Sequence, residues 1–428
     1  MSHAELLARH RKVLPSWLAL YYEQPIELVD GKGCRVVDGE GASYLDFFAG
    51  ILTTMIGYNP PEVVEAVREQ AGRMVHTSTL YLIRRQVELA ERVAELSGIP
   101  DAKVFFTSSG SEANEAALLL ATTARRSNQV LALRNSYHGR SYAAMGVTGN
   151  RSWSASSLTP VNVSYVNGGY SYRSPFRHLD DQAYIAACVD DLRDVIDTTT
   201  AGQVACMIAE PIQGVGGFAV PPDGLLGAMK EVLDEYGILL VSDEVQTGWG
   251  RTGEHFWGIG AHGVTPDIMT FAKGLCNGLA IGGVVARGYL LDGVPANSIS
   301  TFGGNPLATA GARATLDYVL DHDLQANALK VGTRLLTGLR DLGAEHPAVG
   351  DVRGKGLMAA LELVVPGGDQ PDPSAAAKLM EETRARGLLV GKGGRFGNVL
   401  RMAPPLTITE AEADEGLGIL GDSLAALR

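Results

Sequence analysis

The sequence predicts an α/β fold, in which a large unit with a mostly parallel sheet is joined to a smaller α+β unit built from both ends of the chain. Its 428 residues, of which 46% are hydrophobic, are enough for one large unit plus a smaller one. The middle of the chain alternates short apolar runs with amphipathic stretches, which is typical of parallel strands joined by helices. The two ends lack this alternation and mix hairpin, helix and strand patterns.

Residues 26–48 are predicted to form a hairpin, because glycine-rich turns separate short stretches that suit strands. Apolar runs then predict the strands of the main sheet: Val104–Phe106, Val130–Leu133, Val204–Ala209, Ile238–Val241, Ile268–Phe271 and Ile281–Ala286. Between several of these runs lie amphipathic stretches that predict helices, among them Glu112–Arg126 and Leu225–Tyr236.

The last third of the chain predicts a mixture of helices and strands. A long helical pattern follows Asn305-Pro306 and runs to about Leu320. The elements predicted after it are a helix over Leu324–Glu345, a strand over Leu357–Val364, a helix over Ala375–Arg386, a strand over Val399–Met402 and a final helix over Glu410–Leu427. The Pro366–Pro373 stretch indicates an exposed loop.

Charge and cysteine usage exclude several classes of function. The chain has 36 basic and 48 acidic residues, a net charge of −12, and no run of lysines or arginines, so nucleic acid is a poor partner. Its four cysteines are far apart and form no C-x-x-C pair, which argues against disulfides and a structural zinc site. No apolar run approaches the roughly 18 residues of a membrane span. With no secretory signal visible, we expect a cytoplasmic protein that binds no metal.

Polar groups gather where the predicted strands end. Ligands of open α/β sheets bind just beyond the carboxyl ends of the strands. The segments that follow five of the six apolar runs are Thr107–Glu112, Arg134–Arg140, Glu210-Pro211, Ser242–Gln246 and Ala272–Gly274. One edge of the sheet therefore collects a turn of small residues, an aromatic residue beside a histidine, the three acids Glu210, Asp243 and Glu244, and one lysine.

The turn of small residues, Ser108–Ser111, begins a predicted helix. Its free N–H groups and the positive end of the helix dipole suit a phosphate group. An ordinary helix cap is an equally good interpretation of this turn taken alone. The turn is neither a G-x-x-x-x-G-K-[ST] loop nor a G-x-G-x-x-G motif, so it is neither of these two kinds of nucleotide-binding loop.

Lys273 and Asp243 follow two of the apolar runs. Burial at a strand end lowers the pKa of a lysine and frees its amine to form an imine, and a solvent-directed lysine is the alternative. The carboxylate that ends ILLVSD needs a partner, and a protonated ring nitrogen suits it better than a metal because no histidine or cysteine cluster accompanies it. A phosphate seat, an imine-forming lysine, an acid for a pyridinium and an aromatic ring together indicate pyridoxal 5′-phosphate.

The residues at this edge lie in motifs that resemble those of the class III aminotransferases, pyridoxal-phosphate enzymes of fold type I. The motifs follow the family's order and spacing: SSGSEANEA (108–116), YHGR (137–140), EPIQG (210–214), DEVQTGWGRTG (243–253), FAKG (271–274), TFGGNP (301–306) and LRMAPPLT (400–407). The resemblance implies a large cofactor-binding domain over residues 57–322 and a small domain over 323–428, which the N-terminal segment 1–56 joins. It also implies a homodimer with its active sites at the subunit interface.

By this resemblance, Lys273 forms the imine with the cofactor and later moves a proton during catalysis, while Asp243 pairs with the pyridine nitrogen. Further cofactor contacts are implied for Ser109, Gly110 and Ser111 at the phosphate, Tyr137 and Val245 on the ring faces, Gln246 at the phenolic oxygen, and Thr301 of the neighbouring subunit at the phosphate. His138 and Glu210 lie beside the cofactor in this interpretation. The alternative is that His138 is only a packed histidine and Glu210 only an acid on the side of a helix.

Four residues bear on the substrate. Arg401 resembles the arginine that pairs with the substrate carboxylate through its bidentate fork. Val215 stands where 4-aminobutyrate and ornithine enzymes carry a glutamate that covers this arginine, so Arg401 would stay open, as in the alanine–glyoxylate type 2 members. Arg140 and Ile51 instead match pocket residues of the 4-aminobutyrate enzymes.

The resemblance implies transamination between an amino acid or ω-amino acid and a 2-oxo acid. We expect pyruvate or glyoxylate as the acceptor and a ping-pong route through pyridoxamine phosphate. One alternative is a 4-aminobutyrate–2-oxoglutarate aminotransferase, and another is a pyridoxal-phosphate-dependent lyase on the same fold.

Overall fold

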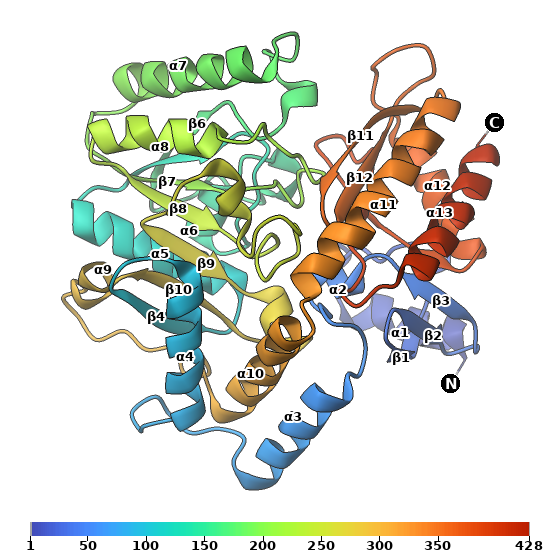
Figure 1. Ribbon diagram of the computed structural model, residues 1–428, viewed down its shortest axis with the longest axis horizontal. Coiled ribbons are helices and arrows are strands. Elements are labelled where there is room, and N and C mark those ends of the chain that lie inside the picture. The colour runs from blue at the N-terminus through green and yellow to red at the C-terminus, as the bar shows by residue number, and fades with distance from the viewer. Residues whose placement is uncertain (1, 428) are drawn as a thin grey trace.

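The computed structural model describes residues 2–427 and is organised around a seven-stranded sheet (Figure 1). The strand order is β4 (Ala102–Thr107), β10 (Gly282–Arg287), β9 (Ile268–Phe271), β8 (Leu239–Asp243), β7 (Val204–Ala209), β5 (Gln129–Leu133) and β6 (Asn162–Val166). The pairs from β9 to β6 are all parallel, and β10 is antiparallel to both of its neighbours. The predicted α/β fold with a mostly parallel sheet is confirmed.

Helices pack on both faces of this sheet, which explains why its strands are continuous apolar runs. In β7, Cys206 and Ile208 belong to the core cluster that includes α5 (Gly110–Arg125), whereas Met207 and Ala209 belong to the cluster that includes α7 (Asp181–Thr199) and α8 (Leu225–Glu235). Successive side chains of a strand point to opposite faces, so both sets must be apolar when both faces are covered. Three further helices surround the sheet edge near β4: α3 (Pro61–Arg73), α4 (Arg84–Ser97) and α10 (Pro306–Asp321).

Two four-stranded sheets are built from the ends of the chain. One has the order β1 (Leu28–Lys32), β2 (Arg35–Asp38), β3 (Ser43–Asp46) and β13 (Leu388–Leu389). The other has the order β11 (Val349–Lys355), β12 (Met358–Leu363), β15 (Val399–Met402) and β14 (Gly391–Gly393). Because β13 pairs with β3, segments from both ends of the chain share one sheet. The helices of these ends are α1 (His3–Val13), α11 (Leu324–Glu345), α12 (Pro373–Ala385) and α13 (Glu410–Ala425).

The prediction of a hairpin over residues 26–48 is wrong in the number of strands. The segment forms three antiparallel strands, β1, β2 and β3. Two glycine-containing turns, one at Gly33 with φ of 58° and one at Gly41 with φ of 89°, each reverse the chain. A glycine adopts positive φ at little steric cost, so both turns close and the chain crosses the sheet a third time.

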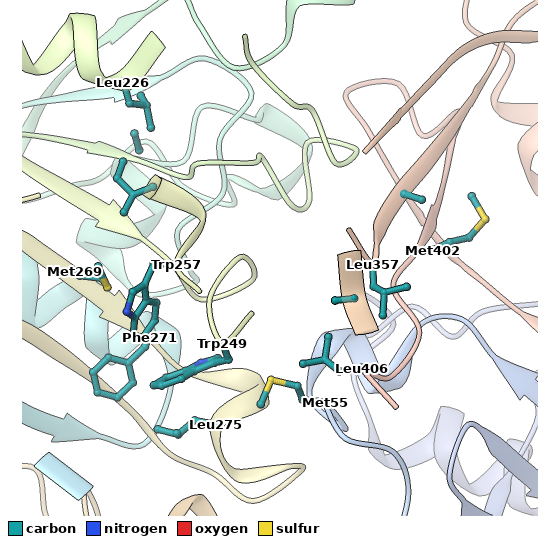
Figure 2. Packing of buried hydrophobic residues seen from close by; sticks show 14 of the residues in the cluster. Met55, Leu226, Trp249, Trp257, Met269, Phe271, Leu275, Leu357, Met402 and Leu406 are labelled. Atoms are coloured by element: carbon teal, nitrogen blue, oxygen red, sulfur yellow. The ribbon is translucent and has the colours of Figure 1, made fainter. Parts of the chain in front are cut away.

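An aromatic core lies at the end of β9, the strand that precedes the predicted lysine (Figure 2). The ring centroids of Trp249 and Trp257 are 4.5 Å apart, and that of Trp249 lies 5.7 Å from that of Phe271. Phe271 ends β9, so this cluster fixes the backbone two residues before Lys273. Large buried aromatic side chains dominate the energetics of such cores. The end of β9 is therefore a rigid support for the side chain that follows it.

No helix within residues 2–427 combines the length and the apolar character needed to cross a membrane.

Candidate active site

A cavity of about 320 Å³ opens at the edge of the large sheet where the predicted functional segments meet. Its lining includes ten of the residues that the sequence singles out: Ser109, Gly110, Ser111, Tyr137, His138, Glu210, Asp243, Val245, Gln246 and Lys273. They come from the ends of β4, β5, β7, β8 and β9. The parallel strands thus bring together side chains that are up to 164 residues apart in the sequence, 273 − 109.

Lys273 is the first residue of a 3₁₀ turn, Lys273–Cys276, that directly follows β9. Its backbone has φ of 46°, a left-handed conformation that costs energy in a residue with a Cβ atom and is concentrated at functional sites. Burial lowers the pKa of its amine, although the negative charges of Asp243 and Glu210 act in the opposite direction. A neutral, buried amine is the form that attacks a carbonyl carbon.

Asp243 ends β8, and both of its carboxylate oxygens are held in place. Oδ2 accepts a hydrogen bond of 2.8 Å from the Asn114 amide and lies 2.8 Å from Nδ1 of His138. Oδ1 accepts one of 3.1 Å from the backbone N–H of Val245. The side chain is only 4% exposed. These partners fix the direction in which the carboxylate meets a ligand in the cavity.

Asn114 is a site residue that the sequence reasoning missed. Its amide also donates to the His138 carbonyl at 2.7 Å, and its Oδ1 accepts from the Thr270 hydroxyl at 2.7 Å. It lies four positions after Gly110 in α5, on the same face of that helix. This i, i+4 spacing inside SSGSEANEA was the available signal. The lining also includes Thr53 and the segment 278–281, for which the sequence offered no such pattern.

The turn at the start of α5 combines both interpretations that the sequence allowed. Ser109 is the N-cap, and its hydroxyl accepts from the backbone N–H of Glu112 at 3.2 Å. Gly110 and Ser111, the first residues of the helix, line the cavity. The Ser111 hydroxyl also accepts from the backbone N–H of Arg140 at 3.1 Å. A 16-residue helix therefore points its N-terminus, with its partial positive charge, into the cavity.

Glu210 is a buried acid in the cavity lining. Its Oε1 accepts from the backbone N–H of Tyr137 at 2.9 Å, and its Oε2 accepts from that of Gly214 at 2.8 Å. Burial raises the pKa of Glu210 to about 7, against the opposing influence of His138. Glu210 thus positions the segment that carries the Tyr137 ring, which also meets the ring of Trp153 edge to face at 5.5 Å.

The cavity fits pyridoxal 5′-phosphate. Two buried polar atoms that face it, Nε2 of His138 and Oε1 of Gln246, have no hydrogen-bond partner among the described residues. Buried polar atoms are almost always paired, so a ligand with polar atoms of its own is expected there. A helix N-terminus for the phosphate, a carboxylate for the ring nitrogen and a lysine of lowered pKa complete the set that this cofactor requires.

Five predicted site residues lie outside this lining. Thr301 and Arg140 are exposed, and the Arg140 guanidinium lies 5.7 Å from the centre of the Trp17 ring. Ile51 is 46% exposed and has φ of 66°. Val215 and Arg401 are buried nearby, where the Arg401 guanidinium donates to the Gly214 carbonyl at 3.1 Å. None of the four residues expected to contact a substrate lines the cofactor cavity, and neither does Thr301, which was expected at the cofactor phosphate of the neighbouring subunit.

Comparisons with known proteins agree with this geometry. The family model described as aminotransferase class III matches residues 20–424. The mitochondrial alanine–glyoxylate aminotransferase 2 homolog 2 of Arabidopsis thaliana is 39% identical over 416 residues, which cover 96% of this chain and 85% of that protein.

Solved structures resemble the whole chain as well. An (S)-enantioselective ω-transaminase from Thermomicrobium roseum has a TM-score of 0.92 and 36% identity, covering 100% of this chain and 99% of the other. An amine transaminase from an uncultivated Pseudomonas species, solved with pyridoxal phosphate bound, has a TM-score of 0.90 and 33% identity, covering 97% and 98%. The chain therefore belongs to the class III aminotransferases of fold type I and is a pyridoxal-phosphate-dependent enzyme that catalyses transamination.

Proposed function

We propose that this aminotransferase uses pyruvate or glyoxylate as its amino acceptor and that Arg401 binds the acceptor's carboxylate. The observation that carries the proposal is the charge of Arg401, which is 3% exposed and lies beside backbone carbonyls and the Tyr21 side chain. Its guanidinium donates to Gly214 at 3.1 Å and to Lys392 at 2.9 Å, and no carboxylate within residues 2–427 pairs with it. A buried cation without a counter-charge is costly, so a substrate carboxylate is the natural partner.

The surroundings of Arg401 favour a small, rigidly held carboxylate. The guanidinium carbon lies 5.0 Å from the centre of the Phe48 ring and 5.4 Å from that of Phe218, so two aromatic faces fix its plane. Burial lowers the pKa of Arg401, and a bound carboxylate would offset this effect. The side chain of Val215 is apolar and buried. It occupies the position at which the 4-aminobutyrate and ornithine enzymes carry a glutamate that covers this arginine.

Within the cavity, Lys273 and Asp243 have complementary proton-handling roles. Bound pyridoxal phosphate supplies an aldehyde that condenses with amines and a ring that accepts the electron pair released at the substrate Cα. Nζ of Lys273, whose pKa burial lowers, would take up the proton from the substrate Cα and deliver it to the carbon of the cofactor's former aldehyde group. Asp243, held by Asn114 and His138, keeps a proton on the ring nitrogen.

The remaining lining residues orient the cofactor. The N-terminus of α5, at Gly110 and Ser111, would hold the phosphate. Tyr137 and Val245, which also line the cavity, would pack against the two faces of the ring, and the Gln246 amide would meet the phenolic oxygen. Glu210 holds the backbone on either side of the ring through Tyr137 and Gly214.

Half-reactions of the purified enzyme test the proposed acceptor. L-Alanine alone should remove the aldehyde-form absorbance of the bound cofactor, and pyruvate or glyoxylate should restore it. Faster restoration by 2-oxoglutarate, after 4-aminobutyrate as donor, would favour the other aminotransferase subgroup. Release of ammonia or phosphate without any need for a 2-oxo acid would instead identify a lyase.

Replacing Arg401 by alanine should raise the KM for pyruvate by roughly 10–100-fold, because hydrogen bonds to a charged group contribute about 1.5–3 kcal/mol. Steady-state kinetics measure this change. An amine donor that lacks a carboxylate serves as the control, and its half-reaction should keep its rate. A pyruvate KM within twofold of the parent value would remove Arg401 from the binding site.

Replacing Val215 by glutamate should also raise the KM for pyruvate, because the new carboxylate would pair with Arg401 and compete with the substrate. Val215→Gln is the matched control, since glutamine has nearly the same size as glutamate but carries no charge. Kinetics at equal ionic strength compare the two variants. If both behave alike, then charge at position 215 does not reach Arg401.

We further propose that the enzyme is a homodimer in which Thr301 completes the phosphate site of the partner. Two segments that meet through the His76 and Phe302 rings, 5.4 Å apart, form an exposed apolar surface. Its members are Met74, Val75, Leu80, Tyr81, Leu82, Ile299 and Phe302, all at least half exposed, with Leu82 99% exposed. A patch of this kind is typical of a protein–protein interface, and Thr301 lies within it.

The Leu82→Asp variant should dissociate the dimer and lose most of the activity, because a buried unpaired charge would lie at the interface. Light scattering coupled to size-exclusion chromatography gives the mass of each species. Leu329→Asp, at an exposed position of α11 outside this surface, should remain dimeric and active. A parent enzyme that is monomeric and fully active would contradict the proposal.

A further inference from the structure

A second cavity, larger than the cofactor cavity, lies between the large sheet and the β14–β15 turn. It measures about 710 Å³, and its walls come from the loops after β5 and β6 and from the turn at residues 395–396. Four of its lining residues are arginines, Arg134, Arg151, Arg173 and Arg395, and none of the described residues that line it is acidic. We call this cavity the arginine cleft. Because the chain carries a net charge of −12, such a concentration of positive charge is not a general feature of its surface.

Only one of the four arginines is neutralised by the protein. Nε of Arg173 donates to the fully buried Glu362 carboxylate at 2.8 Å. For Arg134, Arg151 and Arg395, no ion pair is formed with any residue of the described range 2–427. The guanidinium of Arg395 instead lies 5.2 Å from the centre of the neighbouring Phe396 ring. Three positive charges therefore share one cavity without a counter-charge, which concentrates anions within it.

The other polar groups of the wall are already engaged. The Asn135 amide donates to Gln213 and to the Gly216 carbonyl, each at 3.1 Å. The Asn167 amide donates to Asp191 at 2.8 Å, and the Tyr165 hydroxyl donates to the Gly146 carbonyl. The wall is thus fixed by internal hydrogen bonds, and the three arginines provide the free donors.

We propose that the arginine cleft binds a small anion with two or more negative charges, carried by phosphate or carboxylate groups. Arginine forks match both kinds of oxyanion through paired N–H donors, which lysine cannot do. A single negative charge would leave two of the three free guanidinium groups uncompensated. The volume of the cavity accommodates a ligand with several charged groups.

The cleft is separate from the cofactor cavity but shares a structural element with the Arg401 site. None of its lining residues lines the cofactor cavity. The backbone N–H of Gly394, next to Arg395, donates to the Val215 carbonyl at 3.0 Å. The Lys392 carbonyl, on the same β14 segment, accepts from Arg401 at 2.9 Å. An anion that joins Arg395 to Arg151 would therefore restrain the segment that orients Arg401.

Calorimetric titration of the cofactor-loaded enzyme with pyrophosphate and with citrate, at constant ionic strength, tests the proposal. At least one of the two should bind at one site per chain without changing the cofactor absorbance. The Arg151→Gln/Arg395→Gln double variant should weaken this binding by about tenfold or more, since two charge-assisted contacts are lost. The tighter of the two anions assigns the ligand to the phosphate or the carboxylate class.

A matched double variant, Arg287→Gln/Arg340→Gln, removes the same charge at exposed positions away from the cleft and should bind within about twofold of the parent. The single Arg134→Gln variant, at an exposed side chain, provides a second test should the cleft double variant fold poorly. Equal weakening in both double variants, displacement of the cofactor, or no binding of either anion would overturn the proposal. Because binding is measured without turnover, its outcome is independent of which amino acceptor the enzyme uses.

Discussion

Replacing Lys273 by alanine is expected to abolish turnover while the cofactor remains bound without a covalent link. The loss in kcat should exceed about 10³-fold, because proton transfer by a positioned side chain alone contributes roughly 10²–10⁴-fold. The structure explains why no other lysine can substitute. Lys273 is the lysine that lines the cofactor cavity, and burial lowers the pKa of its amine.

Two measurements separate this role from a structural one. Treatment with borohydride should fix the cofactor to a peptide containing residue 273 in the parent enzyme and to no peptide in the variant. The control is Lys103→Ala, because Lys103 is exposed and pairs with Asp292 at 2.6 Å on the surface. A Lys273→Ala enzyme that turns over at a rate comparable to the parent would exclude Lys273 as the proton carrier.

The positions of Lys273 and Asp243 could be predicted because each directly follows an apolar run. Such runs become central strands, and the carboxyl ends of parallel strands meet at one edge of the sheet. The same logic placed Glu210 and Tyr137 in the cavity lining. Site residues that lie at the carboxyl ends of central strands can therefore be predicted from the sequence.

The elements without a continuous apolar run were harder to predict. Strand β6 reads Asn162–Val166, and its burial pattern is exposed or half-buried until the last residue, since it lies at the edge of the sheet. Strand β11 is also an edge strand and has no fully buried residue. An edge strand has one neighbour and more solvent contact, so apolar content is a weak signal for it.

The direction of β10 could not be predicted either. Its sequence, GGVVAR, is as apolar as that of a parallel strand, yet it runs antiparallel to β4 and β9. Only the path of the connecting segment decides strand direction. The contacts of Asn114 depend in the same way on packing, because α5 brings its amide to Asp243, 129 residues away in the sequence.

Replacing Asp243 by asparagine is expected to reduce kcat by roughly 10²–10³-fold, which is the loss seen when one preorganised electrostatic partner of a transition state is removed. The amide cannot hold a proton on the ring nitrogen, so the ring becomes a poorer acceptor of electrons. The hydrogen-bond donors around position 243 add to this effect. The Asn114 amide and the His138 ring are both 2.8 Å from Oδ2 of Asp243. If the amide nitrogen of the new asparagine took the place of Oδ2, it would face another donor there.

The chemistry of the ring nitrogen allows a test that a purely structural role of Asp243 would fail. A cofactor analogue whose ring nitrogen is methylated carries a permanent positive charge and needs no acid to keep it. Loaded into the Asp243→Asn enzyme, it should recover a substantial part of the lost rate, whereas pyridoxal phosphate itself should not. Asp243→Glu, which keeps the charge, provides the comparison. If the analogue gives no recovery although it binds as tightly as the normal cofactor, then the carboxylate acts on folding or on the position of Asn114 and not on the charge of the ring.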